Sequence, residues 1–157
     1  MPEPGKLQRV LCVTAPAHSK AENVTMLQTI RVKDYMARRL TTLEPDTEIL
    51  HAVHTLIKND IAAAPVVDKD GALIGILTEK DCMRVVLNAC YHSEYGGTVE
   101  DFMSTEVEVM SPEDSITDAA RRFLDKRYHR YPVLDNNRLV GQISRRDVLR
   151  ALGDAWQ

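Results

Sequence analysis

One pattern of a glycine, a hydroxyl and a carboxylate occurs twice in the sequence with the same spacing. It stands as GILTEKD at residues 75–81 and as GQISRRD at residues 141–147. A carboxylate accepts two hydrogen bonds from adjacent sugar hydroxyls, and a hydroxyl beside the free amides of a helix N-terminus suits an anion. The same spacing also forms an N-cap, in which these groups only satisfy the first amides of a helix. Binding and capping therefore both remain open for four residues: Thr78, Asp81, Ser144 and Asp147.

A second candidate is the cationic segment KRYHRYPVLD at residues 126–135, where cations and tyrosines lead into an apolar strand. Such a segment can be a solvated helix end, a nucleic-acid contact or one wall of a pocket for an anion, and a planar guanidinium such as that of Arg130 suits bidentate contacts with phosphate oxygens. Cations with aromatic faces also bind RNA, which we keep as a less favoured alternative for KRYHRY. The net charge of −3 argues against a nucleic-acid partner, because the whole surface does not attract phosphates.

The composition is that of an ordinary globular protein. The chain has 157 residues, of which 44% are apolar and 27% charged, and this is enough for one domain or for two small halves that share a core. No apolar run approaches the roughly 18–20 residues of a membrane span, and the first residues do not form a secretory signal. The three cysteines include no CxxC pair, which indicates reduced thiols. We therefore expect a cytoplasmic protein with no membrane partner.

The sequence consists largely of a duplicated unit. VKDYM at residues 32–36 matches VEDFM at 99–103, which lies 67 residues later, and AAAPVVD at 62–68 matches HRYPVLD at 129–135 at the same distance. One residue is lost in the next turn, so the two glycine patterns are 66 residues apart. In the segment before the repeat, a short strand is expected near Val10–Val13. We predict an N-terminal arm, a first motif, a linker and a second motif at residues 1–28, 29–90, 91–97 and 98–157.

Each copy changes its hydrophobic period in the same order. With LTTL (40–43) and VEVM (107–110) as first strands, each copy is predicted as strand, helix, strand, strand, helix. Ser111, followed by Pro112, is the predicted start of the first helix of the second copy. A copy of about 60 residues is marginal alone, so the two copies must pack together. The predicted fold class is α+β, with two tandem motifs related by a pseudo-twofold axis.

Catalysis and metal binding are not expected. Catalysis needs a nucleophile beside a base, or paired carboxylates in unlike environments, and neither is evident. His51 and His54 have the spacing of a metal pair on a helix, but the second copy has Asp118 and Arg121 at these positions. An arginine at a matched position argues against a shared metal site. We therefore predict that the chain is not an enzyme and holds no metal.

These ordered signals resemble the tandem cystathionine-β-synthase (CBS) domain module. The resemblance rests on the two VxDxM openings, the two PVxD strands and the repeated Gly-x-h-[ST]-x-x-D pattern, and it covers residues 29–152. It implies an energy-sensing, regulatory module that binds an adenosine-containing ligand in the cleft between the motifs. The candidate ligands are AMP, ADP, ATP, NAD and S-adenosylmethionine. The module would modulate a separate, unknown protein by changing its conformation.

The resemblance also implies roles for individual residues. The aspartates, Asp81 and Asp147, would hold the ribose hydroxyls, and Thr78 and Ser144 would lie near phosphate. The further candidates are Arg145 and Arg146 near phosphate, Thr42 and Val109 near adenine, and Ala64, Pro65 and Pro132 in the strands beside the site.

The HRYPV stretch resembles the His-Arg-h-Pro-Val stretch of the nucleotide-sensing subunit of AMP-activated protein kinase. By that likeness His129 and Arg130 would bind phosphate, and Tyr131 would pack near the base or sugar. The first copy has alanines at the matching positions 62–64. Either the second site alone binds a phosphorylated ligand well, or its cations reach across to a ligand held by Asp81.

The apolar faces of the closing helices are wider than one core contact needs. Similar modules pair through such helices, so the resemblance implies a homodimer. A dimerisation scaffold without any ligand is the remaining alternative.

Overall fold

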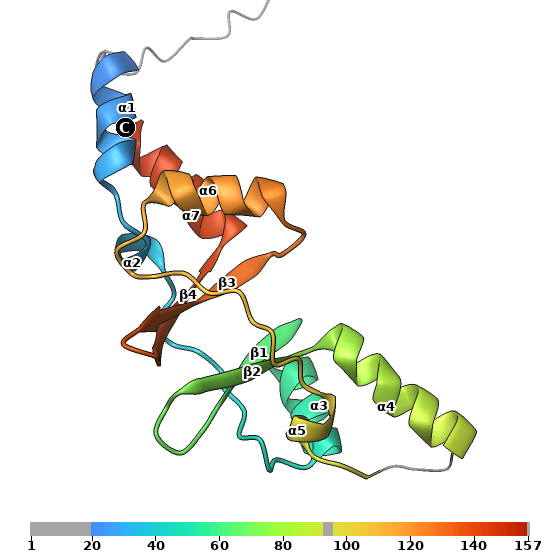
Figure 1. The fold of residues 1–157 in the computed structure, drawn as a ribbon. Coiled ribbons are helices and arrows are strands. Elements are labelled where there is room, and N and C mark those ends of the chain that lie inside the picture. The colour runs from blue at the N-terminus through green and yellow to red at the C-terminus, as the bar shows by residue number, and fades with distance from the viewer. Residues whose placement is uncertain (1–19, 93–95, 157) are drawn as a thin grey trace, which may run out of the picture.

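The computed structural model describes residues 20–92 and 96–156, so the strand expected near Val10–Val13 lies outside the described residues. Figure 1 shows two groups of elements with the chain passing twice between them. In chain order the elements are α1 (Lys20–Thr29), α2 (Val32–Tyr35), α3 (Ile49–Lys58), β1 (Ala63–Val67), β2 (Leu73–Thr78), α4 (Glu79–His92), α5 (Val99–Phe102), α6 (Ile116–Asp125), β3 (Arg130–Asp135), β4 (Arg138–Ser144) and α7 (Arg145–Ala155).

Each motif contains an antiparallel hairpin that packs against its two longer helices. In the first motif β1 pairs with β2, and in the second β3 pairs with β4. The expected first strands are reduced to single parallel bridges, from Leu43 to Val66 and from Met110 to Val133. The pairing is this short because the preceding chain belongs to the other motif, where Ala37 pairs with Gln142. The α+β class is confirmed.

The opening segment of each repeat packs into the core of the other motif. Val32 and Met36 belong to the core of the second motif, whereas Val99 and Phe102 belong to the core of the first. Figure 1 accordingly shows α2 beside the second hairpin and α5 beside α3. The exchange buries apolar side chains of both halves, which neither half of this size can do well alone.

Two matched glycines allow these segments to approach the hairpins. A Cβ added at Gly75 would lie 2.6 Å from the sulfur of Met103, and one added at Gly141 would lie 2.6 Å from the sulfur of Met36. Both distances are far below van der Waals contact, so a side chain at either glycine would displace the opening segment of the other repeat.

The first helix of the second motif starts later than predicted. It begins at Ile116, and the N-cap is Ser115, whose side chain accepts a hydrogen bond from the amide of Asp118. Ser111 instead lies in a preceding turn, in which its amide donates to the carboxylate of Asp114. The predicted start at Ser111 was wrong because the carbonyls of Pro112 and Asp114 accept hydrogen bonds from the amides of Lys33 and Val32, so they do not form a helical turn. In the arm, α1 packs on α6 and α7.

Candidate functional site

Both repeated aspartates form reciprocal caps at the start of a helix. The amide and the hydroxyl of Thr78 donate to Oδ2 of Asp81 at 2.9 and 2.7 Å, and the amide of Asp81 donates back to the hydroxyl at 3.1 Å. Ser144 and Asp147 repeat this arrangement, with 2.9 and 2.6 Å to the carboxylate. The capping alternative is therefore part of the structure, and it engages one oxygen of each carboxylate.

The other carboxylate oxygen is linked to the opening segment of the other repeat. Oδ1 of Asp147 lies 3.2 Å from Arg150, whose guanidinium also donates to the carbonyl of Tyr35 at 3.0 Å. In the first motif Arg84 joins Asp81 to the carbonyl of Phe102 in the same way. The two aspartate side chains are only 13% and 15% exposed. Each site thus connects a helix start to the segment that crosses between the motifs.

A pocket of about 290 Å³ lies between the two motifs. Its wall from the first motif contains two alanines, the middle of β2 and the start of α4, and its wall from the second motif contains the cationic segment before β3. The lining residues are Ala62, Ala63, Ile76, Thr78, Glu79, Lys80, Arg127, Tyr128, His129, Arg130 and Gln142. Of the predicted site residues, the structure therefore brings Thr78, His129 and Arg130 together.

The pocket carries an excess of positive charge on the wall from the second motif. Arg127 and Arg130 form no ion pair with any acid in the described part of the chain. Glu79 is the acid in the lining, and Lys80 lies next to it. Unpaired guanidinium groups beside the first turn of a helix favour a phosphate or another anion.

Gln142 is a pocket residue that the sequence did not identify. Its side chain is 7% exposed, and its Nε2 has no hydrogen-bond partner within the described residues. A buried amide without a partner costs about 1–3 kcal/mol, so an acceptor from a ligand would stabilise it. One signal in the sequence could have pointed to Gln142: the repeat alignment matches this glutamine with the apolar Ile76 of the first motif, which lines the same pocket.

Other predicted site residues lie elsewhere. Tyr131 is fully buried, its ring packs on Phe123 and Tyr128, and its hydroxyl donates to the carbonyl of Arg122. Burial, and to a lesser degree the charge of Glu108, raises the pKa of this phenol. The structure thus places Tyr131 in the core of the second motif and not in the pocket.

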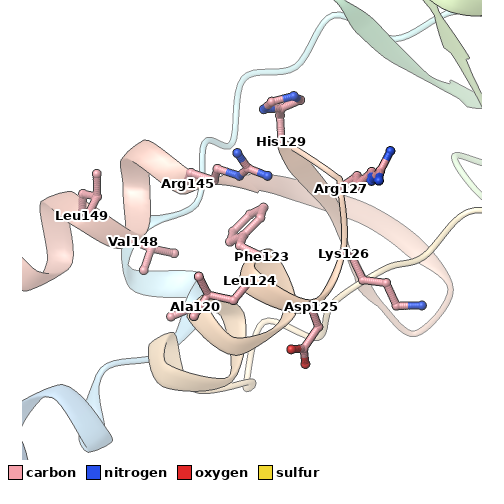
Figure 2. A pocket seen from close by; sticks show the side chains of 10 residues that line it. All are labelled: Ala120, Phe123, Leu124, Asp125, Lys126, Arg127, His129, Arg145, Val148 and Leu149. Atoms are coloured by element: carbon pink, nitrogen blue, oxygen red, sulfur yellow. The ribbon is translucent and has the colours of Figure 1, made fainter.

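The remaining predicted residues do not line the pocket between the motifs. Ala64, Pro65 and Pro132 are buried in the hairpins, and Thr42 and Val109 lie on the two crossing segments. Arg146 is exposed, and Arg145 lines a separate hollow on the outer side of α6 and α7 (Figure 2). Asp81, Asp147 and Ser144 sit at the helix starts described above. Their ligand roles stay predictions.

Two further observations concern metals and membranes. Across residues 20–92 and 96–156, the acids, histidines and cysteines form no cluster of three or more that could hold a metal ion. Within the same ranges, no helix has the length and apolar character to cross a bilayer.

Two interlocked copies of a small α+β motif, with a pocket between them, define a paired-motif fold. The family model described as CBS domain matches residues 32–88 and 99–154. The chain therefore belongs to the CBS-domain family, as the resemblance predicted.

Solved structures and a relative agree with this assignment. CBSX2 in complex with AMP is 26% identical, with a TM-score of 0.72 over 82% of this chain and 99% of that one. The CBS domain pair of protein MJ0100, in complex with 5'-methylthioadenosine and S-adenosyl-L-methionine, is also 26% identical, with a TM-score of 0.67 over 80% and 98%. An uncharacterized protein of Methanocaldococcus jannaschii is 30% identical over 80% of this chain. The matched region spans 44% of the length of that relative.

Proposed function

We propose that this chain is a regulatory module that binds an adenosine-containing ligand in the pocket between its two motifs. The observation that carries the proposal is the composition of that pocket, which unpaired cations and the start of α4 both line and to which Gln142, with its buried and unpartnered amide, also belongs. The complexes of similar structures with AMP and with S-adenosyl-L-methionine support this ligand class.

The geometry favours a ligand that spans both motifs. His129 and Arg130 line the same pocket as Thr78, which places the cations of the second motif beside the helix start that Asp81 caps. The sequence left two arrangements open. We propose the one in which the cations of the second motif reach across to a ligand held at the first motif. A ligand that binds one arrangement of the motifs more tightly shifts the population towards it, and the regulated protein would read this change.

Thermal melting tests the ligand class directly. AMP, ADP, ATP, NAD and S-adenosylmethionine are each added in excess to the same protein sample. A ligand at 100 times its dissociation constant should stabilise the fold by about 2.7 kcal/mol, seen as a higher melting temperature. If none of the five changes the melting temperature, the proposed ligand class is wrong.

A second candidate function is a dimerisation scaffold, which the apolar outer faces of the helices favour. Large apolar side chains are exposed on α3 and α4 and again on α6 and α7. We propose that the chain forms a homodimer through these faces, with or without a ligand. RNA binding through KRYHRY is the weaker alternative, since Tyr131 is buried and offers no ring face to a base. RNA binding would weaken steeply with added salt, and a compact nucleotide pocket would respond less.

A further inference from the structure

The carboxylate of Asp81 has one oxygen that is firmly hydrogen-bonded and one that is not. Oδ2 accepts hydrogen bonds from the amide and the hydroxyl of Thr78 at 2.9 and 2.7 Å. The two donors near Oδ1, a guanidinium nitrogen of Arg84 and the hydroxyl of Ser104, both lie 3.4 Å away. This distance is longer than usual for either kind of donor, so both contacts are weak. Oδ1 can therefore accept a stronger hydrogen bond from a ligand.

Ser104 brings a hydroxyl oxygen to the same place. It directly follows the opening segment VEDFM, and its amide and carbonyl pair with those of Ile76, both at 2.9 Å. Because Ile76 lines the pocket between the motifs, this pairing fixes Ser104 beside a strand of the pocket wall. The Ser104 side chain is exposed, and a hydroxyl that donates to a carboxylate still has lone pairs that can accept. Ser104 is thus able to contact a ligand and Asp81 at once.

These two oxygens fit a vicinal diol. Two neighbouring hydroxyls of a sugar are two donors, and each needs an acceptor when it leaves water. Since the cap occupies Oδ2 of Asp81, the carboxylate alone offers one oxygen to both hydroxyls. The hydroxyl oxygen of Ser104 supplies a second acceptor next to Oδ1. One sugar hydroxyl can donate to each.

The second motif lacks the second acceptor. The residue matched to Ser104 is Ala37, which forms the same backbone pairing with Gln142 but has no hydroxyl. Among the described residues, the donor near Oδ1 of Asp147 is Arg150, at the shorter distance of 3.2 Å. The two aspartates are therefore equivalent as helix caps but not as acceptors for a diol. The pairing of Ala37 also shows that alanine is compatible with the backbone at this position.

We infer that Ser104 is a ligand-binding residue, which together with Asp81 accepts hydrogen bonds from the two ribose hydroxyls of the ligand. This rests on the proposed function and on the predicted role of Asp81 in it. It adds a residue that lies outside the repeated glycine pattern. It also makes the first motif, and not the second, the one that holds the ribose, because Ala37 cannot replace the serine.

Removal of the hydroxyls from both sides tests this role. Calorimetric titration of the whole chain uses AMP and ATP, and the 2′,3′-dideoxy form of each. The wild type should bind the dideoxy forms about tenfold or more weakly, because two hydrogen bonds are lost. Ser104→Ala should lower the affinity for AMP and ATP about threefold to tenfold and leave the affinity for the dideoxy forms unchanged. A purely structural effect of the substitution would weaken both forms alike.

Two further variants serve as controls. Ser104→Thr keeps the hydroxyl and should bind AMP and ATP within about threefold of the wild type. Thr105→Ala removes the next hydroxyl of the same segment, which is also exposed, and should change neither affinity.

The possible results separate this inference from the proposed function. If Ser104→Ala weakens the binding of both forms equally, or of neither, the role of Ser104 is wrong and the proposed function is untouched. The same holds if the wild type binds the dideoxy forms as tightly as AMP and ATP. If neither AMP nor ATP binds, this inference is overturned, and thermal melting with all five ligands decides separately on the ligand class.

Discussion

Gln142 and Ile76 occupy equivalent places in the two repeats but differ in what they bring to the pocket. The amide of Gln142 is buried without a partner in the described structure, whereas Ile76 needs none. Ordinary core residues do not leave such a donor unsatisfied, because its desolvation opposes folding. The amide is therefore the residue that we expect to orient a ligand by donating a hydrogen bond to it.

Gln142→Ile places the residue of the first repeat in the second. Since the variant loses an unsatisfied donor and keeps a good strand residue, the ligand-free protein should become more stable by up to about 1 kcal/mol. The affinity for the best ligand should fall about tenfold, because one hydrogen bond to it is lost. Urea denaturation and calorimetric titration measure the two effects. A variant that binds as tightly as the wild type would exclude Gln142 from the site.

Arg130→Ala tests the cationic wall of the same pocket. Loss of a charge-assisted contact to phosphate costs about 1.5–3 kcal/mol, so calorimetric titration should show an affinity at least tenfold lower. Arg138→Ala removes an exposed cation of β4 that does not line this pocket and serves as the matched control. Equal affinities of the two variants would mean that Arg130 does not bind the ligand.

The helices and strands were largely predictable from the sequence, but the motif into which each opening segment packs was not. Changes of hydrophobic period located the hairpins and the closing helices, because local spacing determines which face is apolar. The repeat shows that Val32 and Val99 are equivalent, but equivalence does not say into which copy each packs. The pocket was predictable in part for the same reason: Thr78, His129 and Arg130, which line it, come from motifs, whereas burial of Gln142 depends on the assembled pocket.

Gly141→Ala tests the exchange of opening segments. The added Cβ would collide with Met36 and with the carbonyl of Ala37, so we expect a loss of about 1–3 kcal/mol in the free energy of unfolding. Gly153→Ala is the control, because nothing lies within 4 Å of its added Cβ and Gly153 lies within α7, where alanine has a higher helix propensity than glycine. It should stabilise the protein by up to about 1 kcal/mol. Urea denaturation compares the two, and equal effects would contradict the close approach.

The cap of α6 gives a prediction for pH dependence. The Ser115 hydroxyl, and to a lesser degree Arg121, lowers the pKa of Asp118 below the ordinary value of an aspartate. A lowered folded-state pKa means that ionised Asp118 stabilises the fold above the unfolded-state pKa, and that this contribution is lost as the pH falls through the folded-state value. Asp118→Asn should therefore reduce stability at pH 7 by less than about 1 kcal/mol, since the side chain is largely exposed.

The loss should disappear in acid. Urea denaturation of the wild type and of Asp118→Asn at pH 7 and again below the folded-state pKa measures the difference at each pH. A difference of the same size under both conditions would show that the ionised carboxylate is not responsible.

At the scale of the whole molecule, the pocket between the motifs and the hollow on the outer side of α6 and α7 share a wall. Arg127 and His129 line both the pocket between the motifs and the hollow on α6 and α7. An anion bound in the pocket would neutralise part of the positive charge on this shared wall. If the proposed ligand and the proposed dimer both form, we expect the two to be coupled through these common residues, and by linkage each would change the other by the same factor.

The coupling predicts that a saturating ligand changes the dissociation constant of the proposed dimer. Sedimentation equilibrium with and without the ligand measures the change, which we expect to be about fivefold or more in the dissociation constant. If the ligand leaves the dissociation constant of the dimer unchanged, the shared wall does not couple ligand binding to dimerisation.

A crystal structure of the complex with the ligand that gives the largest thermal shift tests the central claim most directly. We predict that the ligand lies between the start of α4 and the segment before β3, with an acceptor about 3.0 Å from Nε2 of Gln142 and its anionic group on Arg127 or Arg130. A ligand bound elsewhere, with the amide of Gln142 still unpartnered, would contradict the account.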